Sequence, residues 1–329
     1  MSQTSSDELV KIEDLRISIQ SEGVVFDVVK GVSLSVYADE IVCLVGESGC
    51  GKSMTALSVM GLLPVNVARV TSGKILYGGR DLVGLKARDM RALRAEEISM
   101  IFQDPITSLD PVFTIGSLLK EVIHAHRDVS SSEAEDMAIH ALEEAQLPDA
   151  SKRLKSYAHE LSGGMRQRVM IALATVLNPA VLIADEPTTA LDVTVQAQIL
   201  ESLRARQRER KMGMLLITHD LAVVAAVADR VAVMYSGEIV EESSVTDLFD
   251  NPRHPYTQGL LRAIPDITAR RGSLHAIPGR VPPPQVPPPG CEFAPRCNYS
   301  IDTCWEARPR LLTDTVGKLR CINPQEFAT

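Results

Sequence analysis

Long apolar runs, aromatic residues and cysteines are all scarce in this chain of 329 residues. No stretch approaches the roughly 18 uninterrupted apolar residues that a membrane-spanning helix needs. Six cysteines are too few for a disulfide scaffold. Aromatic residues make up only 4% of the chain, so the apolar share of 45% is mainly aliphatic. That share suffices for a globular core and excludes a chain that is disordered throughout.

Positive charge is also in short supply, because 34 Lys and Arg stand against 42 Asp and Glu, a formal net charge of −8. A protein that binds nucleic acid through its overall charge needs a basic surface, so we expect no nucleic-acid partner. The first 14 residues are polar and acidic and lack the basic start and apolar stretch of a signal peptide. The expected compartment is the cytosol, where cysteines are thiols or metal ligands rather than disulfides.

Short β-rich runs alternate with helical patterns over the first 250 or so residues, which predicts a mostly parallel α/β core. Two runs alternate apolar with polar residues, as half-buried strands do: Leu9–Ile19 and Val32–Val36. Four runs are continuously apolar, as in strands buried on both faces: Ile41–Val45, Val181–Ala184, Met214–Ile217 and Val231–Met234. Between about 104 and 178 the pattern is helical only, with predicted helices at Ile115–His126 and Ser132–Gln146, the second begun by a capping box of Ser132 and Glu135.

Proline and cysteine concentrate near the end of the chain. Eight of the 19 prolines fall between Pro278 and Pro295, which predicts a stiff linker of polyproline type. Four of the six cysteines follow Gly290. This composition separates an accessory C-terminal region from the α/β core.

A complete P-loop pattern, GxxxxGK[ST], follows the apolar run Ile41–Val45 and opens a helical pattern. Its glycines allow backbone N–H groups to wrap a phosphate at a helix N-terminus. The lysine supplies a charge for the β- and γ-phosphates and the serine a hydroxyl for Mg²⁺. The strand–loop–helix context makes a chance glycine-rich turn a poor alternative. The residues of the loop are Gly46, Glu47, Ser48, Gly49, Cys50, Gly51, Lys52 and Ser53.

Two carboxylates end the apolar run that begins at Val181. An acid at the C-terminal end of a buried strand lies at the ligand-binding edge of an open α/β sheet. Asp185 is therefore a candidate for holding Mg²⁺, and Glu186 for polarising an attacking water. In isolation the same pattern also fits a helix cap or a loop acid.

Residues 161–167 read Leu-Ser-Gly-Gly-Met-Arg-Gln and precede the acidic strand by one helical run. This segment resembles the signature of the ATP-binding cassette (ABC) family, which is Leu-Ser-Gly-Gly-Gln or a close variant. In that family it begins a helix and contacts the γ-phosphate of the nucleotide held by the opposite subunit. The resemblance assigns this contact to Ser162, Gly163 and Gly164.

The other cassette elements follow in the family's order between residues 9 and about 245. Gln103 resembles the family's glutamine that senses the nucleotide and contacts Mg²⁺, and Phe26 the aromatic residue that stacks on adenine. Asp192, in the sequence Ala190-Leu191-Asp192, resembles the loop that crosses the dimer interface. His219 resembles the switch histidine that contacts the γ-phosphate and the attacking water. Taken singly, a Phe in the core, a surface Gln or a His that caps a helix would explain each of these as well.

Three segments resemble the peptide-transport branch of the family: residues 101–111, residues 184–196 and Asn251–Thr257, which reads Asn-Pro-Arg-His-Pro-Tyr-Thr. The last also reads as a helix start with Pro255 in the first turn. The resemblance implies a P-loop NTPase (RecA-like) ABC nucleotide-binding domain over residues 8–250, with an antiparallel β-subdomain and a helical subdomain at about 104–178. An oligopeptide-transporter type of extension then occupies 251–329. Asp39 stands where the family usually has glycine, so a positive φ is expected there.

Four cysteines, Cys291, Cys297, Cys304 and Cys321, are spaced x5, x6 and x16. Cytosolic thiolates at such spacings suggest a metal site. The absence of a Cys-x2-Cys knuckle weakens a zinc reading, whereas four cysteines suffice for a [4Fe–4S] cluster. Because members of the dipeptide/oligopeptide branch carry a C-terminal cluster of this kind, the resemblance favours [4Fe–4S] over zinc or unliganded thiols.

The resemblance implies an ATP-hydrolysing subunit of an importer for peptides or similar small solutes, with ATP and Mg²⁺ as cofactors. Its partners would be a second ATPase subunit, expected to form a heterodimer, two transmembrane permease subunits, and a solute-binding protein reached through the permeases. The chain would be peripheral on the cytoplasmic face of the inner membrane. Nickel, opine or oligosaccharide import and a soluble non-transport ABC ATPase remain alternatives, whereas Glu186 and His219 argue against a subunit without turnover.

Overall fold

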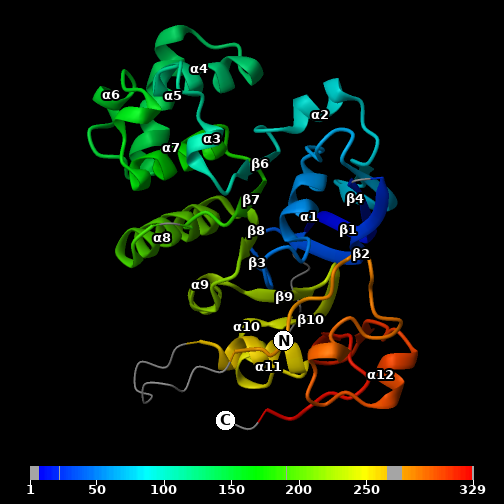
Figure 1. The fold of residues 1–329 in the computed structure, drawn as a ribbon. Helices are drawn as coiled ribbons and strands as arrows, with labels where there is room; N and C mark the ends of the chain where they lie inside the picture. Colours follow the sequence, from blue (N-terminus) through cyan, green and yellow to red (C-terminus); the bar gives the residue numbers. More distant parts are fainter. Residues whose placement is uncertain (1–6, 22, 190, 265–275, 328–329) are drawn as a thin grey trace. The chain divides into compact units, whose positions relative to one another are not determined.

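The structure is a computed structural model that describes residues 7–21, 23–189, 191–264 and 276–327. The chain divides into two compact units. We call Lys11–Ser35, Val42–Val83 and Thr218–Thr329 the P-loop unit. The helical unit consists of Met1–Val10, Val36–Ile41 and Gly84–Ile217. Figure 1 shows the elements in chain order.

A four-stranded sheet in the P-loop unit has the strand order β2-β1-β4-β5. Its strands are β1 (Glu8–Ser21), β2 (Val24–Tyr37), β4 (Ala68–Tyr77) and β5 (Arg80–Asp81). β4 and β5 pair antiparallel, in agreement with the antiparallel β-subdomain that the resemblance implies. Burial alternates along β2 from Lys30 to Tyr37, as the apolar–polar alternation of its sequence predicts.

The second group of strands in this unit surrounds β3 (Ile41–Val45), in which every residue is buried. β3 runs parallel to β9 (Arg230–Tyr235), as two continuously apolar runs predict. β10 (Glu238–Ser244) pairs antiparallel with β9, and β12 (Gly317–Leu319) pairs antiparallel with β10. β11 (Leu312–Thr313) completes the row beside β12. β12 and β11, close to the end of the chain, therefore extend the sheet that contains β3.

The helices of the P-loop unit are α1 (Lys52–Val59), α9 (Leu221–Val227), α10 (Val245–Asp250), α11 (Pro255–Arg262) and α12 (Asp302–Glu306), with a short 3-10 helix η2 at Ala294–Arg296. α11 begins at His254, whose Nδ1 accepts a hydrogen bond of 3.0 Å from the backbone N–H of Tyr256. Pro255 occupies the first turn, where its missing N–H costs nothing. The helix start predicted within Asn251–Thr257 is confirmed.

Aromatic and charged contacts join the C-terminal region to the core of this unit. The ring of Tyr235 in β9 meets Tyr256 edge-on at 4.7 Å and Phe293 at 5.2 Å between centroids. Lys30 in β2 forms an ion pair of 2.6 Å with Glu292, and both side chains are almost completely buried. The region beyond residue 290 is therefore packed into the P-loop unit.

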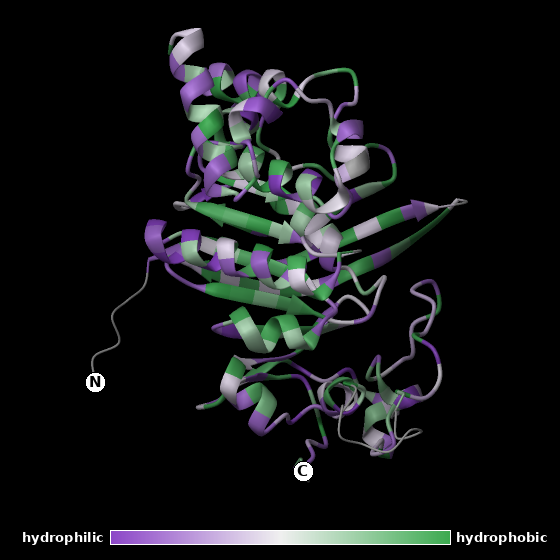
Figure 2. Ribbon diagram, turned by 90° about the vertical axis from the view of Figure 1, so that its left-hand side faces the viewer, coloured by the Kyte–Doolittle hydropathy of each residue, from purple (hydrophilic) through white to green (hydrophobic). Residues whose placement is uncertain are grey.

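The helical unit contains the parallel strands β6 (Ile98–Ile101), β7 (Val181–Asp185) and β8 (Gly213–Thr218). Its helices are α2 (Ala87–Leu93), α3 (Pro105–Ser108), α4 (Ile115–His126), α5 (Ser131–Glu144), α6 (Ala150–Arg153), η1 (Ala158–Glu160), α7 (Gly163–Thr175) and α8 (Val193–Arg210). In this unit, α3, α4 and α5 pack against α7, and Figure 1 shows these helices side by side. The strands of both units are mostly green in Figure 2, whereas the helices mix both colours, as expected for buried strands under amphipathic helices.

Two local predictions in this unit can be compared with the structure. The capping box of α5 is formed by Ser130 and Glu133, so its prediction at Ser132 and Glu135 was wrong by two residues. Both serines have a glutamate three positions later, and the earlier pair adds two residues to the helix. The positive φ expected at Asp39 is confirmed at 58°, and Gln207 Nε2 donates to its carboxylate. Among the described residues, no helix is long and apolar enough to cross a bilayer.

Candidate functional site

The P-loop of the P-loop unit connects β3 to α1 and folds around its own lysine. Lys52 Nζ donates to the carbonyl oxygens of Gly46 at 2.7 Å and Glu47 at 2.9 Å. The lysine is only 5% exposed, although its ammonium group is charged. The loop thus holds a fixed positive charge at the N-terminus of a helix, which is an arrangement that binds phosphate.

Two glycines of the loop are required by close backbone contacts. A Cβ on Gly46 would lie 2.1 Å from the carbonyl oxygen of Met234, and one on Gly51 would lie 2.6 Å from that of Val28. Gly51 is also the N-cap of α1, with a φ of 107° that L-residues rarely adopt. Any larger residue at either position would displace the loop from β2 and β9.

The other predicted residues of this unit lie around the loop in sequence. Ser53 is the second residue of α1, and Phe26 lies half-buried on β2. The thiol of Cys50 is buried, and burial raises its pKa above the usual range. His219 follows β8 and is exposed, and the next residue, Asp220, caps α9 by accepting from the N–H of Ala222 at 2.8 Å.

An acidic edge lies at the end of β7 in the helical unit. Asp185 is 5% exposed, and Glu186 follows it with a φ of 47°. One carboxylate oxygen of Glu186, Oε2, accepts hydrogen bonds from Gln103 Nε2 at 3.1 Å and from Thr189 Oγ1 at 2.8 Å. The structure therefore brings the predicted glutamine and the predicted catalytic acid into direct contact.

The signature segment begins α7, as the resemblance implies. Ser162 is the N-cap, and its hydroxyl accepts from the N–H of Met165 at 3.4 Å. Ser162 and Gly163 are exposed and Gly164 is half-buried, so this helix start is open to a second molecule. A Cβ on Gly164 would lie 3.0 Å from Val195, which favours a small residue there.

Asp192, the predicted residue of the dimer-interface loop, is exposed and caps α8. Its Oδ1 accepts from the N–H of Val195 at 2.9 Å. Ala190, in the same predicted loop, lies outside the described residues.

The prediction of an iron–sulfur cluster at Cys291, Cys297, Cys304 and Cys321 is wrong. Within the described residues, no group of three or more His, Cys, Asp or Glu side chains is placed to hold a metal ion, and the four cysteines are free. A cysteine side chain must lose its proton and become a thiolate to bind a metal ion. Burial instead raises the pKa of Cys291 to about 11 and of Cys321 to about 12, and it raises that of Cys297 above its usual range. The surroundings thus favour neutral thiols.

Two residues of the C-terminal region that contact the P-loop were missed at the level of sequence. Arg296 forms an ion pair with Glu47, and the hydroxyl of Tyr256 accepts from the backbone N–H of Glu47 at 2.9 Å. Glu47 occupies a variable position of the P-loop pattern, so the motif gives it no partner. The only sign of such a partner in the sequence was Glu47 itself, an acidic residue in a loop that binds phosphate.

A strand–P-loop–helix element and a second unit with an acidic strand end define a nucleotide-binding P-loop protein. The ABC transporter family matches residues 29–189, and the family described as the oligopeptide/dipeptide transporter C-terminal region matches residues 240–304. The chain belongs to the ATP-binding proteins of ABC transporters, in the branch that carries this C-terminal region, and it is an ATPase that uses ATP with Mg²⁺.

Individual relatives cover nearly the whole chain. It is 46% identical to the dipeptide transport ATP-binding protein DppD of Bacillus subtilis, over 92% of this chain and 90% of the relative. It is 45% identical to the oligopeptide transport ATP-binding protein OppD of Escherichia coli, over 99% and 96%. The dimeric cassette MJ0796 bound to ADP and Pi in a post-hydrolysis state covers 72% of this chain and 99% of its own, with a TM-score of 0.65 and 26% identity. The predicted cassette fold is confirmed.

Proposed function

We propose that this chain is the ATP-hydrolysing subunit of an importer for peptides or similar small solutes, bound to permeases at the cytoplasmic face of the membrane. The observation that supports this most is a complete set of cassette motifs followed by the oligopeptide/dipeptide C-terminal region in one chain. Relatives that align over nine-tenths or more of both chains are named dipeptide and oligopeptide transport proteins.

In this proposal the P-loop unit binds ATP. Lys52 and the backbone N–H groups of residues 46–53 hold the β- and γ-phosphates, and Phe26 stacks on adenine. Because Lys52 already faces the loop carbonyls of Gly46 and Glu47, its ammonium needs little rearrangement to meet a phosphate oxygen. His219, exposed after β8, contacts the γ-phosphate and the attacking water.

The donors available for Mg²⁺ fit its preference for oxygen ligands. Ser53 offers a hydroxyl in the first turn of α1, Asp185 a carboxylate and Gln103 an amide oxygen. Mg²⁺ typically keeps waters and phosphate oxygens beside one or two protein ligands, so a closed cage of carboxylates is not required. When bound, the ion neutralises charge on the β- and γ-phosphates.

Glu186 acts as the general base in this proposal. Its carboxylate polarises the water that attacks the γ-phosphorus. Gln103 and Thr189 both donate to Oε2 of Glu186. The two donors also fix the direction of the side chain, and in this proposal Gln103 transmits the state of the nucleotide.

The complete site needs a second chain. The signature residues Ser162, Gly163 and Gly164 lie at an accessible helix N-terminus, where exposed N–H groups and a serine hydroxyl suit the γ-phosphate of the partner's nucleotide. Asp192 contributes to the same interface. We propose that the partner is a different ATPase chain, giving a heterodimer with two such composite sites.

Two exposed apolar side chains of the helical unit are the proposed contact with the permeases. Val112 and Phe113, between α3 and α4, are 74% and 47% exposed. They follow Gln103 by about ten residues, so the segment that senses nucleotide leads directly to an apolar surface. A separate solute-binding protein would deliver cargo to the permeases.

Purification of the native complex through a tag on this chain tests the proposal. We expect two permeases and a second ATPase to copurify in mild detergent, and Phe113→Ser to release the permeases while ATP binding persists. Val316→Ser, at an exposed site in the C-terminal region, is the matched control and should retain them. Ribosomes or DNA in place of permeases would contradict the proposal. A binding protein that responds only to nickel chelates, opines or sugars would contradict the peptide cargo alone.

A further inference from the structure

We propose that Arg296, in the C-terminal region, is a positioning residue of the nucleotide site that neutralises Glu47 of the P-loop so that the loop can accept a polyphosphate. The inference rests on the ATP-binding part of the proposed function. It gives the oligopeptide-transporter type of C-terminal region a direct effect on nucleotide affinity. Every residue in the argument belongs to the P-loop unit.

The contact between Arg296 and Glu47 is bidentate. Nη1 of the arginine lies 2.6 Å from Oε2 of Glu47, and Nη2 lies 3.0 Å from Oε1. A planar guanidinium that meets both carboxylate oxygens fixes the orientation of the acid as well as compensating its charge. The hydrogen bond to Glu47 also holds the pKa of Arg296 above its ordinary value, so the arginine stays charged at all relevant pH values.

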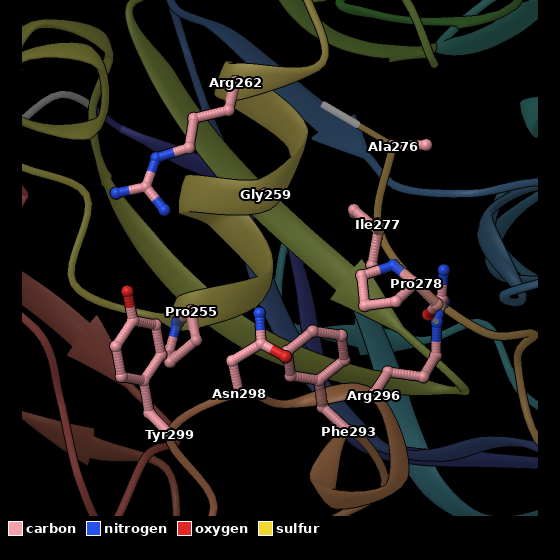
Figure 3. A pocket seen from close by; sticks show the side chains of 10 residues that line it. All are labelled: Pro255, Gly259, Arg262, Ala276, Ile277, Pro278, Phe293, Arg296, Asn298 and Tyr299. Carbon is pink, nitrogen blue, oxygen red and sulfur yellow. Dashed lines mark hydrogen bonds between the residues drawn. The ribbon is translucent and has the colours of Figure 1, made fainter. Parts of the chain in front are cut away.

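Arg296 is itself held from the side of the C-terminal region. Its Nε donates to the carbonyl oxygen of Pro278 at 2.9 Å, and its guanidinium lies over the ring of Tyr235, 5.7 Å from the centroid. Figure 3 shows Arg296 and Pro278 together at one end of a cavity of about 160 Å³, with Phe293 beside them. The arginine side chain is only 4% exposed, so it is prearranged rather than recruited from solvent.

The backbone of Glu47 is held by the same region. The hydroxyl of Tyr256, a residue that is fully buried, accepts from the N–H of Glu47 at 2.9 Å. The carbonyl oxygen of Glu47 in turn accepts from Lys52 Nζ. The side chain, N–H and carbonyl of one P-loop residue are therefore all engaged, two of them by residues beyond 250.

Electrostatics explain why this pairing affects the nucleotide. Glu47 is the second residue of the phosphate-binding loop, and an uncompensated carboxylate there repels a triphosphate and competes with it for Lys52. With Arg296 in place, the pair is neutral and Lys52 remains the net charge of the loop. The C-terminal region thus removes a repulsion that the P-loop sequence creates.

A charge-removal cycle tests the inference on the purified full-length chain, with the dissociation constant of ATP measured by calorimetry. We expect Arg296→Gln to weaken ATP binding about tenfold or more, because it leaves the carboxylate unpaired. Glu47→Gln alone should change binding by about threefold at most, and the double variant should return to the Glu47→Gln value. A purely structural role of Arg296 predicts no such rescue.

Two control variants separate the possible outcomes. Arg308→Gln is the matched control, since Arg308 also belongs to the C-terminal region and pairs with the buried acids Glu292 and Glu238. This variant should leave the ATP affinity within about twofold of the wild type. Lys52→Ala removes the lysine of the P-loop and shows how weak ATP binding becomes without it. A wild type that binds ATP no better than Lys52→Ala would count against the proposed function and not against this inference.

Normal ATP affinity in Arg296→Gln, or a double variant as weak as Arg296→Gln, overturns the proposal. Thermal melts establish that each variant is folded. If Arg296→Gln is unfolded, Arg296→Lys replaces it in the test, because lysine keeps the positive charge but cannot contact both carboxylate oxygens as the guanidinium does. Arg296→Lys must then bind ATP within about threefold of wild type, and a tenfold loss in that folded variant overturns the proposal.

Discussion

Glu186 follows the last residue of β7, where two side-chain donors share one oxygen of its carboxylate. We expect Glu186→Gln to bind ATP as the wild type does but to lose at least about 100-fold in turnover, because an amide cannot take a proton from water. ATP binding and phosphate release by the assembled complex measure the two effects. Asp247→Asn, in the first turn of α10 of the P-loop unit, is the control for losing one carboxylate. Turnover of Glu186→Gln near the wild-type rate would contradict the proposed base.

His254 gives a prediction about pH. Burial lowers the pKa of His254 to about 3, while the unfolded chain keeps the ordinary value of 6.5. Below about pH 6.5 the unfolded state therefore binds a proton that the folded state excludes, so this residue's contribution is complete above that pH and is lost as the pH falls toward 3.

The variant His254→Asn isolates this effect, since asparagine also accepts a hydrogen bond at a helix N-cap and has no proton to gain. Between pH 7 and pH 5 the wild type should lose roughly 2 kcal/mol of unfolding free energy relative to the variant. Urea unfolding at both pH values measures the difference. A difference that is independent of pH would contradict the buried neutral histidine.

Individual residues show where sequence interpretation succeeded and where it failed. Lys52 and Ser162 lie where their motifs place them, because both depend on a local turn into a helix. The partners of Glu47 could not be inferred, because Arg296 is almost 250 positions away and only tertiary packing brings it to the loop. The metal-site prediction for the four C-terminal cysteines failed because it rested on their spacing, whereas burial raises the pKa of Cys291 and Cys321 and favours their neutral thiols.

At the scale of elements, continuous apolar runs predicted β3, β7, β8 and β9 closely, whereas β10 was missed. β10 contains three glutamates, Glu238, Glu241 and Glu242, and all three are buried. Arginines and lysines compensate them: Arg308 and Arg320 for Glu238, Arg253 for Glu241, and Arg230 and Lys318 for Glu242. Several of these basic residues come from the C-terminal region. The burial of β10 therefore depends on partners that are distant in sequence and could not be predicted from the hydropathy of the strand.

The buried pair between Lys30 of β2 and Glu292 joins two elements in the same way. Glu292→Ala should lower the unfolding free energy by about 3–5 kcal/mol, because it leaves a buried ammonium without its partner. The matched control is Glu135→Ala in the partly exposed pair Lys120–Glu135, which should cost less than about 1 kcal/mol. Equal losses of unfolding free energy in the two variants would show that this contact of the C-terminal region contributes little to the stability of the P-loop unit.

At the scale of the whole molecule, the signature segment and the proposed general base, Glu186, belong to the helical unit, whereas the P-loop belongs to the P-loop unit together with the C-terminal region. In the proposed function, hydrolysis uses residues of both units and of a second chain, so an isolated chain should bind nucleotide better than it hydrolyses it. The C-terminal region is then a part of the nucleotide-binding unit rather than an appendage.

The central claim is that ATP hydrolysis by this chain drives peptide uptake. The most direct measurement is the ATPase rate of the tagged native complex in proteoliposomes, with and without peptide-loaded binding protein, for wild type and Glu186→Gln. The account predicts a rate that peptide-loaded binding protein stimulates and a variant in which this stimulation is lost together with peptide uptake. A wild-type rate that is indifferent to loaded binding protein, or peptide uptake that persists in the variant, would contradict it.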